Sequence, residues 1–222
     1  MRCEADGSIT VVADSFEGKR LNIPNDLAVD LNGNVWFTDP YYGAAVGWEV
    51  NDENQDLDHA SVYRADPQPY GSWSLIRLTF DTTDPNGILL SLDNKTLYVA
   101  QSRREPDEIR QLRAYPIGED GSLGPAKVFY DFGAHRGIDG MCLDTEGNIL
   151  ATAGSIESGP GPSILVFSPD GEVIDRHPVL QDPTNCTFGG PDLTTLYVTT
   201  SGGHLFRAFT ERRGRLAYPQ IE

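Results

Sequence analysis

The 222-residue sequence lacks long hydrophobic runs and an excess of basic residues. No run approaches the roughly 18 apolar residues of a membrane-spanning helix, so we expect no membrane partner. Lys and Arg number 17 against 33 Asp and Glu, which gives a net charge of -16. This charge argues against nucleic acid as a partner, because phosphate-binding surfaces need clustered Lys and Arg.

Cysteines are few and irregularly placed. The three of them, Cys3, Cys142 and Cys186, lie far apart in the sequence. An odd number at such spacing is neither a disulfide framework nor a zinc ligand set, so we expect reduced thiols in the core. Met1 leads directly into polar residues, without the apolar segment of a secretory signal. Together these features predict a cytoplasmic location.

The common catalytic motifs are also missing. The sequence contains no G-x-S-x-G, H-E-x-x-H, P-loop or C-x-x-C pattern, and its four histidines show no ligand spacing. What it does contain is 23 Gly and 15 Pro residues, which leave little room for long helices. Between the Asx-Gly turns lie short runs rich in Val, Ile, Leu, Tyr and Phe, such as 9–12 and 164–167. Short strands with frequent turns predict an all-β fold.

A repeat decides which all-β fold to expect. Four times, a polar residue stands 10 or 11 residues before a strand-like run. The polar residues are Asn25, Asn86, Asp139 and Asn185, and the runs continue from Val35, Leu97, Ile149 and Leu196. A constant offset under irregular spacing indicates one supersecondary unit with loops of different length between copies. Units of this size, with four strands each, predict a single β-propeller domain over residues 1–222, with repeat units beginning near 25, 86, 139 and 185.

The polar residues at these positions are candidates for a metal site. Equivalent positions in a ring point toward its axis, and the oxygens of Asn25, Asn86 and Asp139 suit hard cations such as Ca²⁺ or Mg²⁺. Asn-Gly and Asp-Gly are ordinarily hairpin turns. Here the prolines before Asn25 and Asn86 disfavour that alternative, because proline cannot donate to a central strand ladder. Side-chain alternation predicts that Asp26 points away from the site.

The motifs of this sequence resemble those of gluconolactonases and senescence marker protein (regucalcin), with diisopropyl fluorophosphatase as a more distant relative. The segments that carry the resemblance are 19–26, 36–43, 85–87 with 97–99, 139–141 and 184–192. The match runs from about residue 4 to residue 209, in the family's order. It implies a six-bladed propeller with a divalent ion on its axis, commonly calcium, that hydrolyses sugar lactones or related esters.

The resemblance also implies roles for the three polar residues. Asn86 and Asp139 would be direct metal ligands, and Asn25 would lie beside them as a ligand or substrate contact. The ion, Ca²⁺ first with Mg²⁺ and Zn²⁺ as alternatives, would polarise the lactone carbonyl. Asp139, as ligand and candidate base, would help a water attack.

One family ligand has no counterpart in this sequence. It is a glutamate near the start of the first blade, in a Glu-Gly-Pro-like setting, whereas Glu4 and Glu17 belong to outer strands of a later blade. We therefore expect about two N-terminal blades of six to be missing and lactonase activity to be impaired. Exposed blade edges would then favour self-association.

Two other functions remain open from the sequence. One is a hydrolase of phosphotriesters or fluorophosphates that uses the same site. The other is a calcium-binding or interaction propeller without enzymatic activity, which the absent glutamate would favour.

Overall fold

The structure is a computed structural model that describes residues 1–41, 55–102, 109–158 and 161–215. Within these residues the chain forms three four-stranded antiparallel sheets, one three-stranded sheet and two short hairpins. A single 3-10 turn, η3 (Pro69–Gly71), interrupts this described part of the chain. No helix of the described residues is long and apolar enough to cross a membrane.

Each sheet is built from strands that follow one another in the chain. The first contains β5 (Leu27–Val29), β6 (Val35–Asp39), β7 (Ser61–Pro67) and β8 (Trp73–Arg77). The second contains β9 (Pro85–Leu90), β10 (Thr96–Gln101), β11 (Gln111–Pro116) and β12 (Lys127–Asp131). The third contains β13 (Ile138–Leu143), β14 (Ile149–Ala153), β15 (Ser163–Phe167) and β16 (Val173–Pro178). The last contains β17 (Pro183–Gly189), β18 (Thr195–Thr200) and β19 (Leu205–Phe209).

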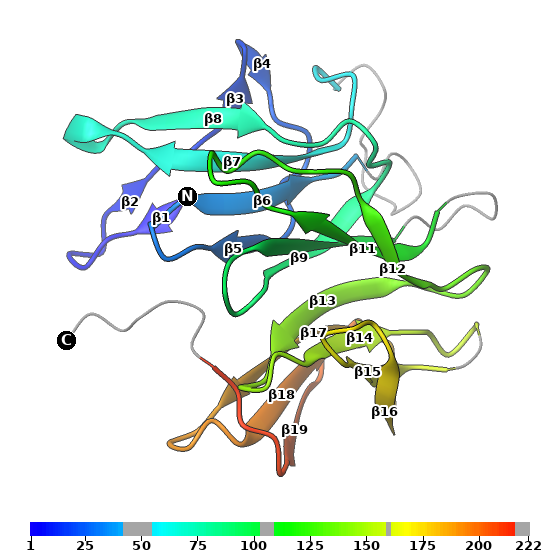
Figure 1. Ribbon diagram of the computed structural model, residues 1–222. Coiled ribbons are helices and arrows are strands. Elements are labelled where there is room, and N and C mark those ends of the chain that lie inside the picture. Colours follow the sequence, from blue (N-terminus) through cyan, green and yellow to red (C-terminus); the bar gives the residue numbers. More distant parts are fainter. Residues whose placement is uncertain (42–54, 103–108, 159–160, 216–222) are drawn as a thin grey trace.

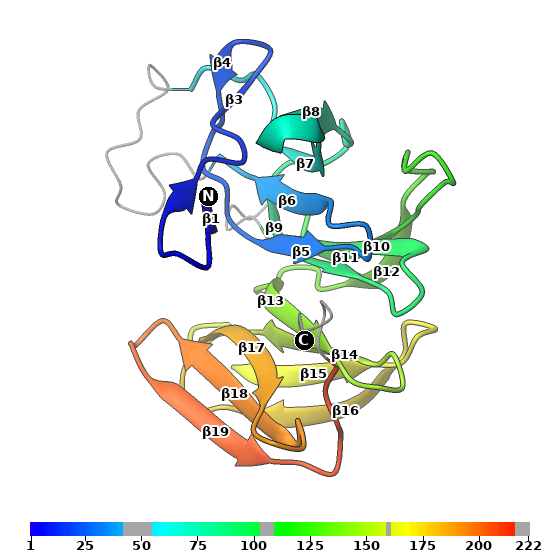
Figure 2. The same ribbon diagram turned by 90° about the vertical axis from the view of Figure 1, so that its left-hand side faces the viewer.

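The sheets are blades of a propeller. Their inner strands β5, β9, β13 and β17 contact one another in that order, and each sheet extends outward from its inner strand. Figures 1 and 2 show the β5–β8 and β9–β12 blades in the upper half and the β13–β16 and β17–β19 blades below them. Three four-stranded blades and one three-stranded blade among the described residues confirm the predicted all-β propeller.

Two hairpins precede the first of these blades. Strand β1 (Arg2–Cys3) pairs with β2 (Ile9–Thr10), and β3 (Ser15–Phe16) pairs with β4 (Lys19–Arg20). The second hairpin and the residues before it pack on the outer face of the β5–β8 blade, where Phe16 of β3 contacts the ring of Tyr63. The N-terminal segment therefore covers one flank of the propeller.

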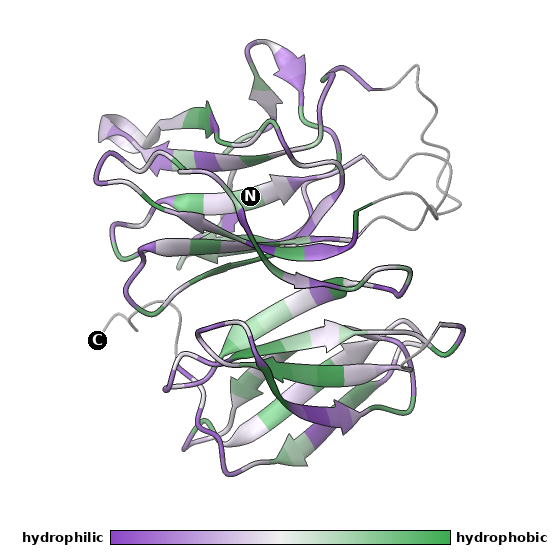
Figure 3. Cartoon of the chain, turned by 45° about the vertical axis from the view of Figure 1, so that its right-hand side comes forward, coloured by the Kyte–Doolittle hydropathy of each residue, from purple (hydrophilic) through white to green (hydrophobic). Residues whose placement is uncertain are grey.

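The core lies between the blades rather than inside any one of them. Trp36, Ile88 and Tyr115 belong to the layer between the β5–β8 and β9–β12 blades. A second layer separates β9–β12 from β13–β16, and a third separates β13–β16 from β17–β19. Many of the most hydrophobic stretches lie on strands, whereas hydrophilic stretches are frequent in the loops (Figure 3).

Two of the inner hairpins close with the same turn. Asp30 and Asp144 each accept backbone N–H groups two and four residues further on, all at 2.9 Å. Gly33 and Gly147 supply the left-handed conformation that these turns need, with φ of 82° and 85°. The repeated turn shows that the Asx-Gly pairs after the inner strands are hairpins, as the sequence predicted.

The cysteines are reduced, but they do not all lie in the core. Cys186 is buried and Cys142 is half-buried, with their sulfur atoms 3.7 Å apart on β17 and β13. Cys3 is exposed on β1, which corrects the expectation of a core position. This strand belongs to a short hairpin at the edge of the structure, so nothing in the described residues covers it.

Candidate functional site

The inner strands carry β-bulges where the predicted polar residues stand. On β9, the pair Asn86–Gly87 together opposes Ala100, because the register shifts by one residue there. On β13, Asp139–Gly140 opposes Thr152 in the same way. A bulge re-aims side chains and is common beside active sites. These two dipeptides are therefore features of inner strands and not hairpin turns.

The first unit has the same arrangement. The backbone N–H of Asn25 donates to the carbonyl of Thr38 at 2.9 Å, and the N–H of Thr38 donates to the carbonyl of Asp26 at 3.0 Å. Asn25 and Asp26 thus oppose Thr38 as a two-residue bulge just before β5. Asn25, Asn86 and Asp139 consequently occupy one equivalent position at the same end of three neighbouring inner strands.

The fourth unit departs from the predicted alignment. On β17, Asn185 pairs with Thr199, and the extra residue of the bulge is Thr184. Thr184 is therefore the structural counterpart of Asn86 and Asp139, and Asn185 comes one position later. The sequence offset was misleading because the hairpin between β17 and β18 is one residue longer than that between β9 and β10.

Glycines after the polar residues allow the inner strands to approach closely. A Cβ atom at Gly87 would overlap the backbone carbonyl of Asp139, and one at Gly140 would overlap the side chain of Asn185. Any side chain at these two positions would push neighbouring blades apart. The Asn-Gly and Asp-Gly sequences are thus explained by the packing of adjacent inner strands.

Asp139 is held by an arginine that the sequence analysis did not single out. Nη2 of Arg136 donates to Oδ2 of Asp139 at 2.8 Å. Nη1 donates to the carbonyls of Gly154 and Pro183, at 2.9 and 3.0 Å. Arg136 therefore ties Asp139 to the end of β14 and the start of β17. In the sequence, the only indication of this contact is that Arg136 stands three residues before Asp139.

Asp26 does not point away from Asp139, contrary to expectation. Its Oδ2 accepts the backbone N–H of Ile88 on β9 at 3.2 Å, and its Oδ1 accepts that of Leu27 at 2.9 Å. Burial raises the pKa of the Asp26 carboxyl, and the nearby charge of Asp139 raises it further. The bulge breaks the alternation of side chains on which the expectation depended.

Asn86 provides the strongest sign of a missing partner. Its side-chain oxygen is buried and has no hydrogen-bond partner, while its backbone carbonyl accepts the Thr38 hydroxyl at 2.8 Å. An unsatisfied buried acceptor costs about 1–3 kcal/mol, so a bound cation or polar ligand would relieve it. The Asn25 amide and the Asp139 carboxylate stand at the equivalent positions of the neighbouring strands, and oxygen donors of these types suit a hard cation. The described residues contain no cluster of three or more His, Cys, Asp or Glu side chains that could hold a metal.

A cleft runs between the four inner strands. Its volume is about 320 Å³, and residues from β5, β9, β13 and β17 line it, including Asp26, Ile88, Met141 and Asn185. Asp26 and Asn185, from the bulges of the first and fourth units, line this cleft, whereas Asn25, Asn86 and Asp139 do not. A cleft of this volume is large enough for a small ligand.

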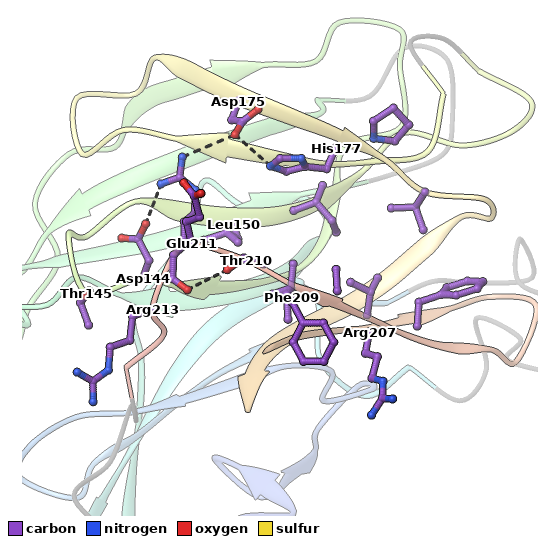
Figure 4. A pocket seen from close by; sticks show the side chains of 18 of the residues that line it. Asp144, Thr145, Leu150, Asp175, His177, Arg207, Phe209, Thr210, Glu211 and Arg213 are labelled. Carbon is purple, nitrogen blue, oxygen red and sulfur yellow. Dashed lines mark hydrogen bonds and ion pairs between the residues drawn. The ribbon is translucent and has the colours of Figure 1, made fainter. Parts of the chain in front are cut away.

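A larger pocket of about 750 Å³ lies elsewhere, between the β13–β16 and β17–β19 blades (Figure 4). Arg212 contacts Asp144 and Asp175 at its rim, at 3.0 and 3.8 Å, and His177 contacts Asp175 at 3.1 Å. No residue of the inner strands β5, β9, β13 and β17 lines it. We attribute this pocket to the wedge between two blades of which the last has only three strands.

Comparison with known protein families gives one match over most of the chain. Residues 1–202 match the family described as SMP-30/Gluconolactonase/LRE-like region. This range contains all three predicted site residues and all four inner strands.

Individual relatives are lactonases and a fluorophosphatase. The chain is 34% identical over 200 residues to a gluconolactonase of Zymomonas mobilis, covering 86% of this chain and 52% of that protein. It is 29% identical to a 6-deoxy-6-sulfogluconolactonase of Pseudomonas putida, covering 80% and 53%, and 27% identical to diisopropyl-fluorophosphatase of Loligo vulgaris, covering 97% and 66%. The chain thus spans about half the length of the first two relatives.

Two solved structures of similar fold also match this chain over most of its length. A gluconolactonase of Xanthomonas campestris superimposes with a TM-score of 0.74 at 30% identity, covering 93% of this chain and 63% of that one. A structure described as a putative gluconolactonase gives a TM-score of 0.77 at 31% identity, covering 95% and 66%.

Proposed function

The chain belongs to the SMP-30/gluconolactonase/LRE-like family, and we propose that it hydrolyses sugar lactones at the end of the inner strands where Asn25, Asn86 and Asp139 lie. The observation that carries this proposal is the buried, unpartnered side-chain oxygen of Asn86. It lies at the bulge of β9, next to the strand that carries Asp139, so an oxygen donor and a carboxylate share one end of the inner strands. The names of the lactonase relatives support the substrate class.

The same residues would hold a divalent ion, Ca²⁺ in preference to Mg²⁺ or Zn²⁺. Asn86 and Asp139 would bind it directly, and Asn25 would serve as a further ligand or as a substrate contact. When bound, such an ion supplies a Lewis acid that polarises the lactone carbonyl and offsets the charge that develops on its oxygen. Two amide oxygens and the carboxylate of Asp139 are ligands that favour a hard cation over a soft one.

The chain's own residues would do the remaining work. Arg136 bonds the Asp139 carboxylate at 2.8 Å, which fixes the direction from which it can accept a proton from an attacking water. Asp26 anchors the neighbouring bulge to Ile88 and keeps the first two inner strands in register. The cleft between the inner strands would enclose the sugar ring.

The test is hydrolysis of glucono-1,5-lactone by the purified chain, with and without a chelator and with Ca²⁺ restored. We expect metal-dependent turnover that Asp139→Asn and Asn86→Ala reduce strongly. Because the first-blade glutamate of the family has no counterpart, we expect the rate of this chain to be well below that of its longer relatives. Turnover that a chelator leaves unchanged would contradict the role of the ion.

A second candidate function is hydrolysis of phosphotriesters or fluorophosphates at the same site. The similarity to the fluorophosphatase over 97% of this chain favours it. A panel of lactones and fluorophosphates, assayed with the same preparations, would separate the two activities. Calcium binding without turnover of either class would instead indicate a non-enzymatic propeller.

A cytoplasmic location and self-association belong to the same proposal. Phe209 and Leu205 of the edge strand β19 are 81% and 67% exposed, and β19 pairs only with β18 among the described residues. Apolar side chains on an unpaired edge favour association with a second copy.

A further inference from the structure

Thr38 on β6 contacts the backbones of Asn25, Asp26 and Asn86. Its N–H and carbonyl pair with Asp26 and Asn25, at 3.0 and 2.9 Å. Its hydroxyl accepts the N–H of Asp26 at 3.1 Å and donates to the carbonyl of Asn86 at 2.8 Å. The residue is fully buried, so water does not compete for these bonds.

The hydroxyl forms a bridge between two blades. Asp26 belongs to the bulge before β5, whereas Asn86 belongs to the bulge on β9, so one oxygen atom links both bulges. A hydroxyl has one proton, and the carbonyl of Asn86 is its nearer acceptor, compared with 3.4 Å to that of Asp26. The bridge therefore sets how far apart the backbones of the two bulges lie.

The same kind of bridge recurs in a longer form at one other junction, and at the third an alanine takes the place of the threonine. Between β13 and β17, Thr152 occupies the equivalent position, but its hydroxyl reaches the carbonyl of Thr184 only at 3.3 Å. Between β9 and β13, Ala100 stands at this position, and the contact of Gly87 with Asp139 brings the strands together. The short hydroxyl bridge thus occurs at the junction that joins Asn25 to Asn86.

From these contacts we infer that Thr38 is a positioning residue of the ion site, which sets the separation of Asn25 and Asn86. This inference rests on the proposed function, because it assumes that these two amides bind one ion. Without the hydroxyl, the N–H of Asp26 and the carbonyl of Asn86 would both lose a buried partner. The bulges would shift to regain hydrogen bonds, and the two amide oxygens would shift with them.

Two substitutions at Thr38 separate the hydroxyl from the packing of the side chain. Thr38→Val keeps the shape and removes the bridge, whereas Thr38→Ser keeps the hydroxyl and removes a methyl group. Thr79→Val is the matched control. Thr79 is buried, and its hydroxyl accepts the N–H of Val62 at 2.8 Å, on the far side of the blade from the bulges.

Calorimetric titration with Ca²⁺ is the main measurement, and the melting temperature is measured in parallel. We expect Thr38→Val to weaken Ca²⁺ binding about tenfold and Thr38→Ser to stay within about twofold of the wild type. Thr79→Val should lower the melting temperature by about as much as Thr38→Val but leave the Ca²⁺ affinity unchanged. In lactone hydrolysis at saturating Ca²⁺, Thr38→Val should lower kcat more than it raises KM.

The outcomes distinguish the inference from the proposed function. Equal Ca²⁺ affinity in Thr38→Val and wild type, or equal loss in the serine variant, would overturn the positioning role alone. Ca²⁺ binding that follows the expected order without any lactone turnover would overturn the proposed reaction and leave Thr38 as a positioning residue. A wild-type chain that binds no divalent ion would overturn both.

Discussion

The backbone N–H of Ile88 donates a hydrogen bond to Oδ2 of Asp26, 3.2 Å away on the neighbouring blade. This bond joins the inner strands of two blades directly beside the candidate ion site. It also orients a second carboxylate toward the end of the strands where Asp139 lies; burial raises the pKa of Asp26, and the charge of Asp139 adds to that effect. The site therefore depends on contacts between blades, and we expect substitutions at these contacts to affect it.

The first prediction concerns the charge of the ion site. Asp139→Asn should weaken Ca²⁺ binding more than Asn25→Asp does, because Asp139 carries the only formal charge among Asn25, Asn86 and Asp139. Affinity of oxygen sites for Ca²⁺ follows ligand charge. Calorimetric titration of both variants measures the difference. Equal affinities would count against the assignment of these ligands.

The second prediction concerns a buried carboxyl outside the site. Asp39 is fully buried, its Oδ2 accepts the N–H of Asn22 at 2.9 Å, and its Oδ1 has no partner. Burial raises the pKa of Asp39 from 3.8 to about 6, against the opposing effects of backbone hydrogen bonds and Arg77. The folded state thus binds this proton more tightly than the unfolded state. The resulting stability is present below about pH 4 and is lost as pH rises through about 6.

Asp39→Asn cannot ionise and should therefore be more stable than the wild type at neutral pH. The gain should be at most about 3 kcal/mol, which corresponds to roughly two pKa units, and should vanish near pH 4. Thermal unfolding between pH 4 and 8 measures it, with the exposed Asp192→Asn as control. A constant difference between Asp39→Asn and wild type across this range would refute the explanation.

A third prediction tests the close approach of the inner strands. Gly87→Ala should destabilise the fold by about 1–3 kcal/mol, because its Cβ would overlap the backbone carbonyl of Asp139, which cannot move alone. Gly202→Ala is the control, since there a Cβ would meet only the end of the flexible Gln181 side chain. Urea denaturation of both variants gives the free energies. A Gly87→Ala variant as stable as Gly202→Ala would show that the strands can separate freely.

The fourth prediction concerns association through the last blade. Phe209→Glu should shift the chain toward the monomer, because Phe209 is 81% exposed on the edge strand β19 and a charge there opposes burial. Phe80→Glu, which changes another exposed aromatic residue on a different blade, is the control. Sedimentation over a range of protein concentrations would show the oligomeric state. A wild-type chain that stays monomeric at all concentrations would remove the basis for self-association.

Much of the fold could be predicted from the sequence because the strand signals are local. The runs continuing from Val35, Leu97, Ile149 and Leu196 became β6, β10, β14 and β18, the second strand of each blade. Their β-branched and aromatic residues, bounded by Asx-Gly turns, specify a strand without reference to the rest of the chain. Repetition of the unit then predicted a propeller, and the three polar positions followed from the same repeat.

What only the tertiary structure decided is how those strands pair and which blades touch. The sequence could not show that Thr184 rather than Asn185 is the fourth equivalent residue, because a bulge depends on the partner strand and not on local propensity. Nor could it show that Arg136 bonds Asp139, or that Thr38 bridges to Asn86, 48 residues away. Sequence by itself determined the repeating unit and its polar positions, since both arise from local patterns. The contacts between blades that would position those residues arise only when separate units pack together.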